Sequence, residues 1–169
     1  MAVAIKDTSG RPAYECVVGR SAELSELLNA FARGVRVTYL YGLAGIGKST
    51  LLVTFAQRAR AIGAKVVSLD CRAMEPTERG FLNEISILRG ESISSPQSAA
   101  KWLGSLGPQV VVLLDNFEVY CLMDTWLRQV FIPRLPENVQ LLLSGNGRPV
   151  LSWHIAASPA LSTHIMELG

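Results

Sequence analysis

A chain of 169 residues that is 49% hydrophobic has enough apolar side chains for one globular domain, with a central sheet covered by helices on both faces. Its net charge of +2 comes from scattered cations, which gives no argument for nucleic-acid binding, and its three cysteines without a C-x-x-C pair favour reduced cytoplasmic thiols over a zinc site. Its longest apolar runs are far shorter than the roughly 18 residues that span a bilayer, and no signal-peptide core is present, so we expect no membrane contact.

The first regular element is expected after a flexible leader over residues 1–14. Residues 15–24 read Glu-Cys-Val-Val-Gly-Arg-Ser-Ala-Glu-Leu. Ser21 is a favourable N-cap, Glu23 suits the positive end of a helix, and large apolar residues then recur at helical spacing as far as Gly34. The sequence therefore predicts an amphipathic helix that starts at Ser21.

Residues 42–49 match the G-x-x-x-x-G-K-[ST] pattern of a phosphate-binding P-loop at every defined position. A strand-like stretch over 35–41 precedes the loop and a helical pattern follows it, which is the context that a P-loop requires. Glycines let main-chain N–H groups approach an anion, Lys48 reaches the β- and γ-phosphates, and Ser49 ligates Mg²⁺. The alternative is a glycine-rich turn that binds nothing. The residues expected to bind the nucleotide here are Gly42, Leu43, Ala44, Gly45, Ile46, Gly47, Lys48, Ser49 and Thr50.

Beyond the P-loop helix, strands and helices continue to alternate. A second strand is expected over 65–70, then a loop over 71–79 and two short helices, the second with Ser95 as its cap and Pro96 at its first position. Such alternation predicts an α/β fold, in which crossover helices connect the strands of a parallel sheet.

Residues 109–115 give the second strong signal. Five consecutive apolar residues, 110–114, describe a strand buried on both faces, and Asp115 ends it where parallel sheets open towards a ligand. This pattern fits a Walker B segment, whose carboxylate would hold Mg²⁺ together with Ser49, directly or through water. The alternative role for Asp115 is the N-cap of the next helix.

Three further elements complete the predicted sheet. Apolar residues at helical spacing predict a helix over 123–131, which Pro133 interrupts. A fourth strand is expected over 139–143 and a fifth over 164–168.

Two stretches carry a family resemblance. The Val-Val-Gly-Arg-x-x-Glu-Leu segment upstream of the P-loop resembles the start of AAA+ and STAND ATPases (signal-transduction ATPases with numerous domains), in which it folds over the adenine. The resemblance implies that Val17, Val18 and Gly19 lie against the base, with Arg20 near the nucleotide. The alternative is a helix start on an ordinary turn.

The second stretch, Leu-Leu-Asp-Asn-Phe-Glu at 113–118, is similar to the Walker B segment of STAND ATPases, where D-N-x-E is a frequent variant. Most AAA+ ATPases have Glu directly after the Asp, a position that Asn116 occupies here, so the candidate base is Glu118; its alternative is a helix-start acid in solvent. STAND relatives usually carry a γ-phosphate-sensing Arg soon after the fourth strand. This chain has Asn146 there, the residue type of AAA+ sensor 1, and Arg148 two residues later.

The resemblance implies a three-layer P-loop NTPase fold over residues 15–169, with a parallel five-stranded sheet in the order 5-1-4-3-2, followed by a lid and downstream domains that this sequence lacks. It implies the Mg·ATP-binding core of a STAND-type signalling switch, with slow hydrolysis of ATP to ADP in the full-length protein and catalytic roles for Lys48, Asp115 and Glu118. Protein partners or self-association would act through the missing domains. ATP is favoured over GTP because no N-K-x-D sequence occurs. The alternatives are an AAA+ loader or initiator acting on DNA, although direct nucleic-acid binding by this domain is not expected, and a non-hydrolysing nucleotide-binding scaffold.

Overall fold

The computed structural model describes residues 19–154 and 162–169. Within them, five parallel strands form one sheet in the order β2-β3-β4-β1-β5. Counted from the other edge, this is the predicted order 5-1-4-3-2, so the fold class and the strand order are both confirmed. The strands are β1 (Val37–Tyr41), β2 (Lys65–Asp70), β3 (Val110–Asp115), β4 (Val139–Gly145) and β5 (Thr163–Glu167).

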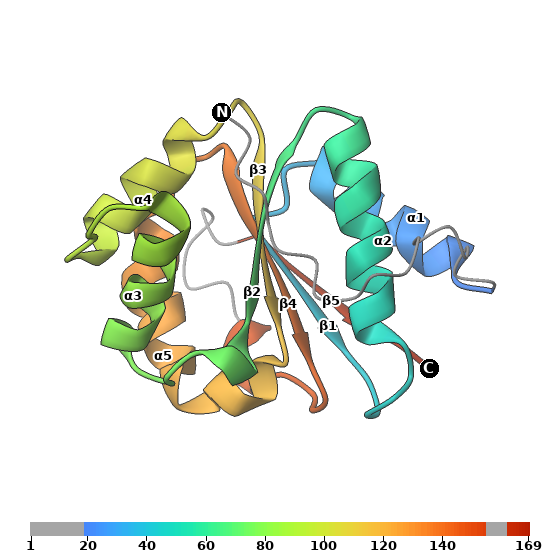
Figure 1. Cartoon of the computed structure of the whole chain (residues 1–169). Helices are drawn as coiled ribbons and strands as arrows, with labels where there is room; N and C mark the ends of the chain where they lie inside the picture. The colour runs from blue at the N-terminus through green and yellow to red at the C-terminus, as the bar shows by residue number, and fades with distance from the viewer. Residues whose placement is uncertain (1–18, 155–161) are drawn as a thin grey trace.

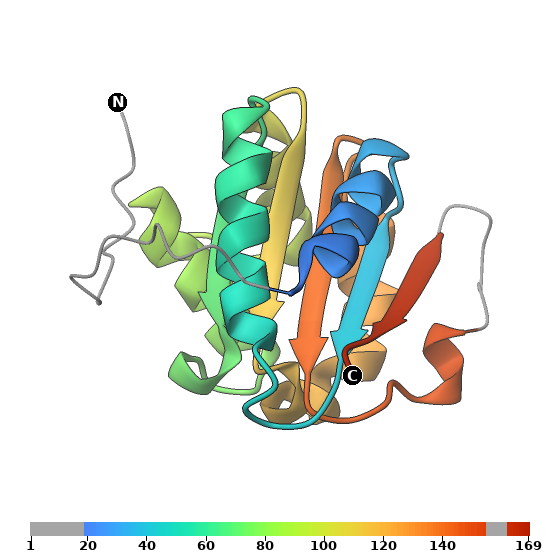
Figure 2. The same cartoon turned by 90° about the vertical axis from the view of Figure 1, so that its right-hand side faces the viewer.

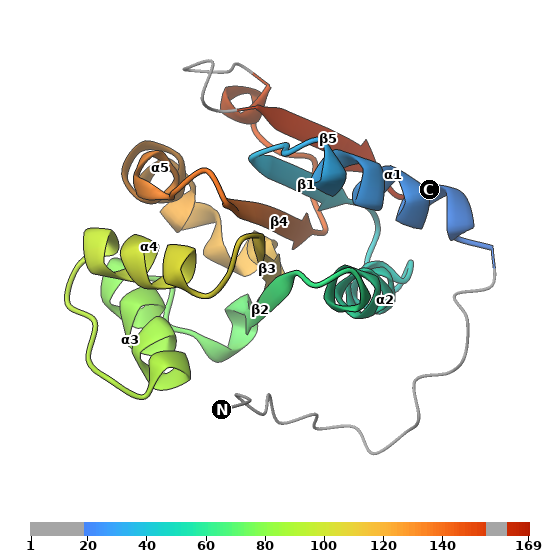
Figure 3. The same cartoon turned by 90° about the horizontal axis from the view of Figure 1, so that it is seen from above.

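Helices cover both faces of the sheet and give the molecule three layers (Figure 1, Figure 3). On one face lie α1 (Ser21–Ala32) and α2 (Lys48–Ala61), and on the other α3 (Glu78–Arg89), α4 (Pro96–Ser105) and α5 (Asp124–Trp126). Short turns extend them: η1 (Cys71–Ala73), η2 (Phe117–Met123), the π-helical η3 (Leu127–Phe131), η4 (Ile132–Arg134) and η5 (Leu151–Trp153). None of the helices in the described ranges combines the length and apolar character that crossing a membrane requires.

Each face of the sheet has its own apolar core. Along β3, Val110, Val112 and Leu114 belong to the cluster that includes residues of α3 and α4, whereas Val111 and Leu113 belong to the cluster under α1 and α2. All five side chains are buried. The prediction that this run is a strand covered on both faces is therefore confirmed. Because side chains alternate between the two faces along a strand, residues two positions apart point to the same face.

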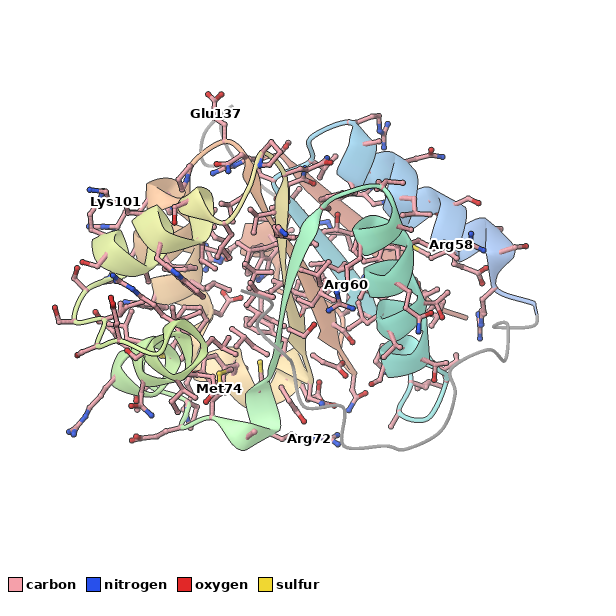
Figure 4. All side chains as sticks on the ribbon, turned by 45° about the horizontal axis from the view of Figure 1, so that its top comes forward. Arg58, Arg60, Arg72, Met74, Lys101 and Glu137 are labelled. Carbon is pink, nitrogen blue, oxygen red and sulfur yellow. The ribbon has the colours of Figure 1, made fainter. Side chains whose placement is uncertain are left out.

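The carboxyl ends of the strands meet at one edge of the sheet, beside the loop that connects β1 to α2 (Figure 2). Within that edge, the Gly42 N–H donates to the carbonyl oxygen of Gly145 at 3.3 Å and ties the loop to the end of β4. Figure 4 shows Arg72, just after β2, and Glu137, just before β4, at opposite ends of the molecule. A ligand site at the edge near Arg72 follows from this arrangement, because open parallel sheets bind ligands at the carboxyl ends of their strands.

The apolar face predicted for a helix over 123–131 is correct, but the segment is not a regular α-helix. Met123, Leu127 and Phe131 are buried, but a 3-10 turn, three α-helical residues and a π-helical turn share the segment. The π-helical spacing brings Trp126 and Phe131, five residues apart, into a stacked pair with ring centroids 5.6 Å apart. Aromatic packing therefore overrides the regular helical repeat.

Two helix starts also differ from expectation. The prediction that Ser21 caps α1 is wrong, because Arg20 occupies the N-cap position and no side chain caps this helix. The loop predicted over 71–79 ends at Thr77, whose hydroxyl accepts a hydrogen bond from the Gly80 N–H at 3.0 Å and so begins α3 early.

Candidate nucleotide-binding site

The P-loop has the backbone geometry that an anion cradle needs. A Cβ at Gly42 would lie 2.5 Å from the carbonyl oxygen of Leu168, so only glycine fits where the loop leaves β1. Gly45 and Gly47 take positive φ angles of 81° and 102°, which glycine adopts without strain. Gly47 is also the N-cap of α2, and no side chain caps this helix. The N–H groups of its first turn, which includes the exposed Ser49 and Thr50, therefore remain available to phosphate oxygens.

Lys48 lies at the junction between the P-loop and the end of β4. Its side chain is buried, and its Nζ donates to the carbonyl oxygens of Gly42 and Leu43, both at 2.8 Å, and to Oδ1 of Asn146 at 2.9 Å. The last contact connects residues that are 98 positions apart. A phosphate that binds the loop would compete with these acceptors for the ammonium group.

The turn after β3 has an unusual backbone. Asn116 has a φ of 58°, and among residues 19–154 and 162–169 it is the one non-glycine with positive φ. Its N–H donates to Oδ1 of Asp115 at 2.9 Å, and its Nδ2 donates to Oδ1 of Asp70 at 2.8 Å. The same Asp70 oxygen accepts from the Arg72 N–H at 3.0 Å. Asp70 therefore holds the left-handed turn that leads from Asp115 into η2.

Glu118 faces the site rather than solvent. Its Oε1 accepts from Nδ2 of Asn146 at 2.7 Å, its Oε2 accepts from the Asn146 N–H at 3.2 Å, and its side chain is 27% exposed. A Cβ at Gly145 would lie 3.2 Å from Oη of Tyr39, a tight contact, whereas Oε2 of Glu118 at 3.7 Å would be at an ordinary packing distance. Asn146 thus links Lys48 to Glu118, and we call this pair of contacts the Asn146 bridge.

A nearby tyrosine does not compete for the role of proton acceptor. Burial, with the charges of Asp124 and Glu118 as smaller causes, raises the pKa of Tyr39 to about 12. The phenol therefore stays neutral at physiological pH. In the described part of the chain, the carboxylates of Asp70, Asp115 and Glu118 all form hydrogen bonds at or beside the turn that follows β3.

The upstream segment contacts the P-loop through Arg20. One guanidinium nitrogen donates to Oε1 of Glu23 at 2.9 Å and to the carbonyl oxygen of Gly169 at 2.7 Å, and the other donates to the carbonyl oxygen of Ile46 at 3.3 Å. Gly19 precedes it with a φ of 94°. Val17 and Val18, expected against the adenine, lie outside the described residues.

Arg148 lies near Tyr41, the last residue of β1. Tyr41 donates its hydroxyl to Oε2 of Glu167 at 2.8 Å, and this bond raises the pKa of Tyr41, while the charge of Arg148 acts in the opposite direction. Arg148 is exposed. It follows Asn146 by two positions in the chain and takes no part in the Asn146 bridge.

The residues present fit a P-loop magnesium site. In the described ranges, no three His, Cys, Asp or Glu side chains gather into a metal cluster. A P-loop needs none, because Mg²⁺ takes a hydroxyl, one or two carboxylates, phosphate oxygens and water. Ser49 and Asp115 could supply the protein groups of such a set. Cavity volume does not mark the site: cavities of about 450 and 620 Å³ lie along α3 instead, with Arg79 and Asn83 in both walls.

Sequence reasoning missed Asp70 and Arg72. Arg72 lies 3.7 Å from Oε1 of Glu118, so Asp70 at the end of β2 and Arg72 just after it both contact the turn that follows β3. A signal was available, because Asp70 ends an expected strand in the same way as Asp115, and the two are register partners in the sheet. The predicted strand order sets β2 beside β3, but no motif marks Asp70 or Arg72 as contacts of the turn that follows β3.

Comparisons with known proteins agree with this geometry. No curated protein matches the sequence. Of the solved structures, the Aeropyrum pernix ORC1 protein in complex with DNA matches 93% of this chain with 47% of its own, at 20% identity and a TM-score of 0.61. A Walker-type ATPase of Pyrococcus abyssi matches at 18% identity and a TM-score of 0.63, and the match covers 94% of this chain and 57% of the ATPase. Drosophila ORC bound to AT-rich DNA and Cdc6 matches at 19% identity and a TM-score of 0.60, and the match covers 87% of this chain and 53% of the matched chain.

These identities support a shared fold, and the chain spans about half the length of the solved relatives it matches. The sequence model for the AAA ATPase domain matches residues 17–109, more than half of the chain. That match includes the P-loop and the upstream segment with Arg20. The chain therefore belongs to the AAA ATPase domain family of nucleotide-binding proteins.

Proposed function

We propose that this domain is the Mg·ATP-binding core of a STAND-type switch, a signalling ATPase whose partner binding or self-association follows its nucleotide state. The observation that carries the proposal is the Asn146 bridge. It connects the ammonium group that would meet the β- and γ-phosphates to a carboxylate beside the Walker B strand, through one amide. A γ-phosphate that competes for Lys48 would change what Asn146 and Glu118 can bind, which is the coupling that a nucleotide switch requires.

Each residue has a distinct part in this proposal. Bound Mg²⁺ supplies charge neutralisation at the phosphate oxygens, and Ser49 and Asp115 would hold it. Glu118 would accept a proton from the attacking water, for which it must come within about 3 Å of that water, directly or through one further water. Asn146 would orient the water or a phosphate oxygen. Arg148 would answer to the γ-phosphate, and Val17, Val18, Gly19 and Arg20 would enclose the base.

The residue after Asp115 supports a switch that hydrolyses ATP slowly over an ATPase with fast turnover. Asn116 cannot accept a proton near neutral pH, and its amide is bonded to Asp70, away from the Asn146 bridge. The only carboxylate in that turn is Glu118, whose two oxygens are both engaged by Asn146. Hydrolysis would therefore require Glu118 to be released first. We further propose that a lid and output domains outside this sequence complete the site and contact protein partners.

A binding measurement combined with hydrogen exchange tests this proposal. Calorimetry should detect binding of Mg·ATP and Mg·ADP, and the affinity of the domain for GTP should be lower than for either. Amide exchange at 115–118 and 144–148 should then differ between the ATP and ADP complexes, since only ATP brings a γ-phosphate to Lys48. If both nucleotides give the same exchange pattern, the domain is a nucleotide-binding scaffold and not a switch.

A second candidate is a loader or initiator ATPase that acts on DNA. It is favoured by the solved relatives, two of which are ORC proteins in complexes with DNA. Cations on this domain are scattered, with Arg58 and Arg60 on α2 and Lys101 on α4. Fluorescence anisotropy with duplex DNA distinguishes the candidates, because an initiator should bind with an affinity that falls steeply as salt rises.

A further inference from the structure

One buried hydroxyl near the site has no role in the function proposed above. Ser144 on β4 is 0% exposed, and its Oγ has no hydrogen-bond partner among the described residues. A buried hydroxyl that gains no bond keeps the full cost of leaving water. Alanine would fill the same space without that cost. The position therefore calls for a partner that becomes available in another state of the protein.

The sheet register shows what Ser144 faces. Leu143 pairs with Leu114, so the next step along the two parallel strands sets Ser144 opposite Asp115. Two positions earlier on each strand, Leu142 and Leu113 both belong to the core cluster under α1 and α2. Since side chains alternate along a strand, Ser144 and Asp115 point to that same face, which is the face of the P-loop helix.

Ser144 also lies directly under the phosphate-binding loop. The next residue, Gly145, accepts a hydrogen bond from the Gly42 N–H at 3.3 Å. The one after it, Asn146, accepts from Nζ of Lys48 at 2.9 Å. The hydroxyl is thus on the floor of the site, between the strand that ends in the magnesium carboxylate and the strand that leads into the P-loop.

We propose that Ser144 is a positioning residue for the metal carboxylate. Its Oγ–H donates to a carboxylate oxygen of Asp115 and leaves the remaining oxygen lone pairs for Mg²⁺. In the present structure the two side chains are not bonded, and Asp115 accepts from the Asn116 N–H instead at 2.9 Å. The proposal therefore requires the Asp115 carboxylate to turn towards β4 when metal and nucleotide bind. It rests on the Mg·ATP site proposed above.

The test compares Ser144→Ala and Ser144→Thr with the parent protein. We expect Ser144→Ala to melt at the same or a higher temperature without nucleotide, because an unpaired buried hydroxyl is removed. Its Mg·ATP affinity should fall roughly tenfold, the usual size of effect for a residue that orients a metal ligand, while ATP affinity in EDTA is unchanged. Ser144→Thr, which keeps the hydroxyl, should retain most of the magnesium dependence. Ser68→Ala removes an exposed hydroxyl from β2 and serves as the control.

Three outcomes would overturn the inference. The first is an unchanged Mg·ATP affinity in Ser144→Ala. The second is an equal loss with and without Mg²⁺, which would mean a packing defect. The third is a further loss of affinity when Ser144→Ala is added to Asp115→Asn. If the parent protein itself does not bind Mg·ATP, the proposed function has failed, and that result is visible before any Ser144 variant is measured.

Discussion

The two walls of the nucleotide site are assembled differently. The P-loop wall is made of consecutive residues, 42–50, whose backbone angles and glycines define it locally. The facing wall brings together three separate segments, 70–72, 115–118 and 144–146, through hydrogen bonds of Asp70, Asn116, Glu118 and Asn146.

This difference assigns phosphate binding to the P-loop wall and the structural change that follows binding to the facing wall. The P-loop wall would hold phosphates through the main-chain N–H groups of consecutive residues and of the helix start. A wall of three strand ends changes when any one of them moves, because its contacts are side-chain hydrogen bonds across strands. Lys48 is the single described side chain that bonds to both walls, through Gly42 and Asn146. Variants in each wall should therefore alter different measurements.

The largest expected effect lies in the facing wall. Glu118→Gln, in a chain that carries the lid, should cut ATP hydrolysis by roughly a hundredfold or more while Mg·ATP affinity stays within a few-fold, because an amide cannot take the proton from water. Phosphate release and calorimetry measure the two quantities. Glu137→Gln, at the opposite end of the sheet, is the control. Parent-like hydrolysis by Glu118→Gln would make Glu118 a structural partner of Asn146 and nothing more.

The next effect belongs to the P-loop wall. Lys48→Ala should weaken Mg·ATP binding at least about tenfold, or about 1.4 kcal/mol, because the loop dipoles only partly offset the β/γ-phosphate charge. Lys101→Ala removes a cation from the exposed surface of α4 and should leave affinity unchanged. Circular dichroism checks that both variants fold. Equal affinities for the two variants would remove the P-loop assignment.

Asp70 gives a smaller effect that concerns the turn alone. Asp70→Ala loses the acceptor that holds Asn116 and the Arg72 N–H, so we expect about 1 kcal/mol less stability and a few-fold slower hydrolysis. Asp70→Asn keeps an acceptor oxygen and should stay close to the parent protein. Urea unfolding and phosphate release measure both changes. If Asp70→Asn slows hydrolysis as much as Asp70→Ala does, Asp70 is instead a catalytic carboxylate.

The contrast between the walls also explains how far sequence reasoning reached. The position of Asp115 and the P-loop were predictable, because apolar periodicity and a fixed glycine spacing are local signals, and the family resemblance supplied the strand order. The contact between Glu118 and Asn146 spans 28 positions and depends on β3 lying beside β4. Asp70 and Ser144 had no motif to reveal them, since their meaning comes from the neighbouring strand.

The smallest expected effect is that of Asn116→Gly, which together with Asn116→Ala separates the backbone from the side chain at this position. A left-handed backbone costs a non-glycine residue about 1 kcal/mol, and asparagine tolerates it best after glycine. Asn116→Gly removes that strain but also the bond to Asp70, so stability should stay within about 0.5 kcal/mol of the parent protein. Asn116→Ala keeps the strain and loses the bond, and we expect about 1 to 2 kcal/mol less stability, with hydrolysis changed much less than in Glu118→Gln. The urea midpoints of the two variants decide the matter, because Ala as stable as Gly would mean that the turn relaxes out of the left-handed region and that Asp70 has no strained turn to hold.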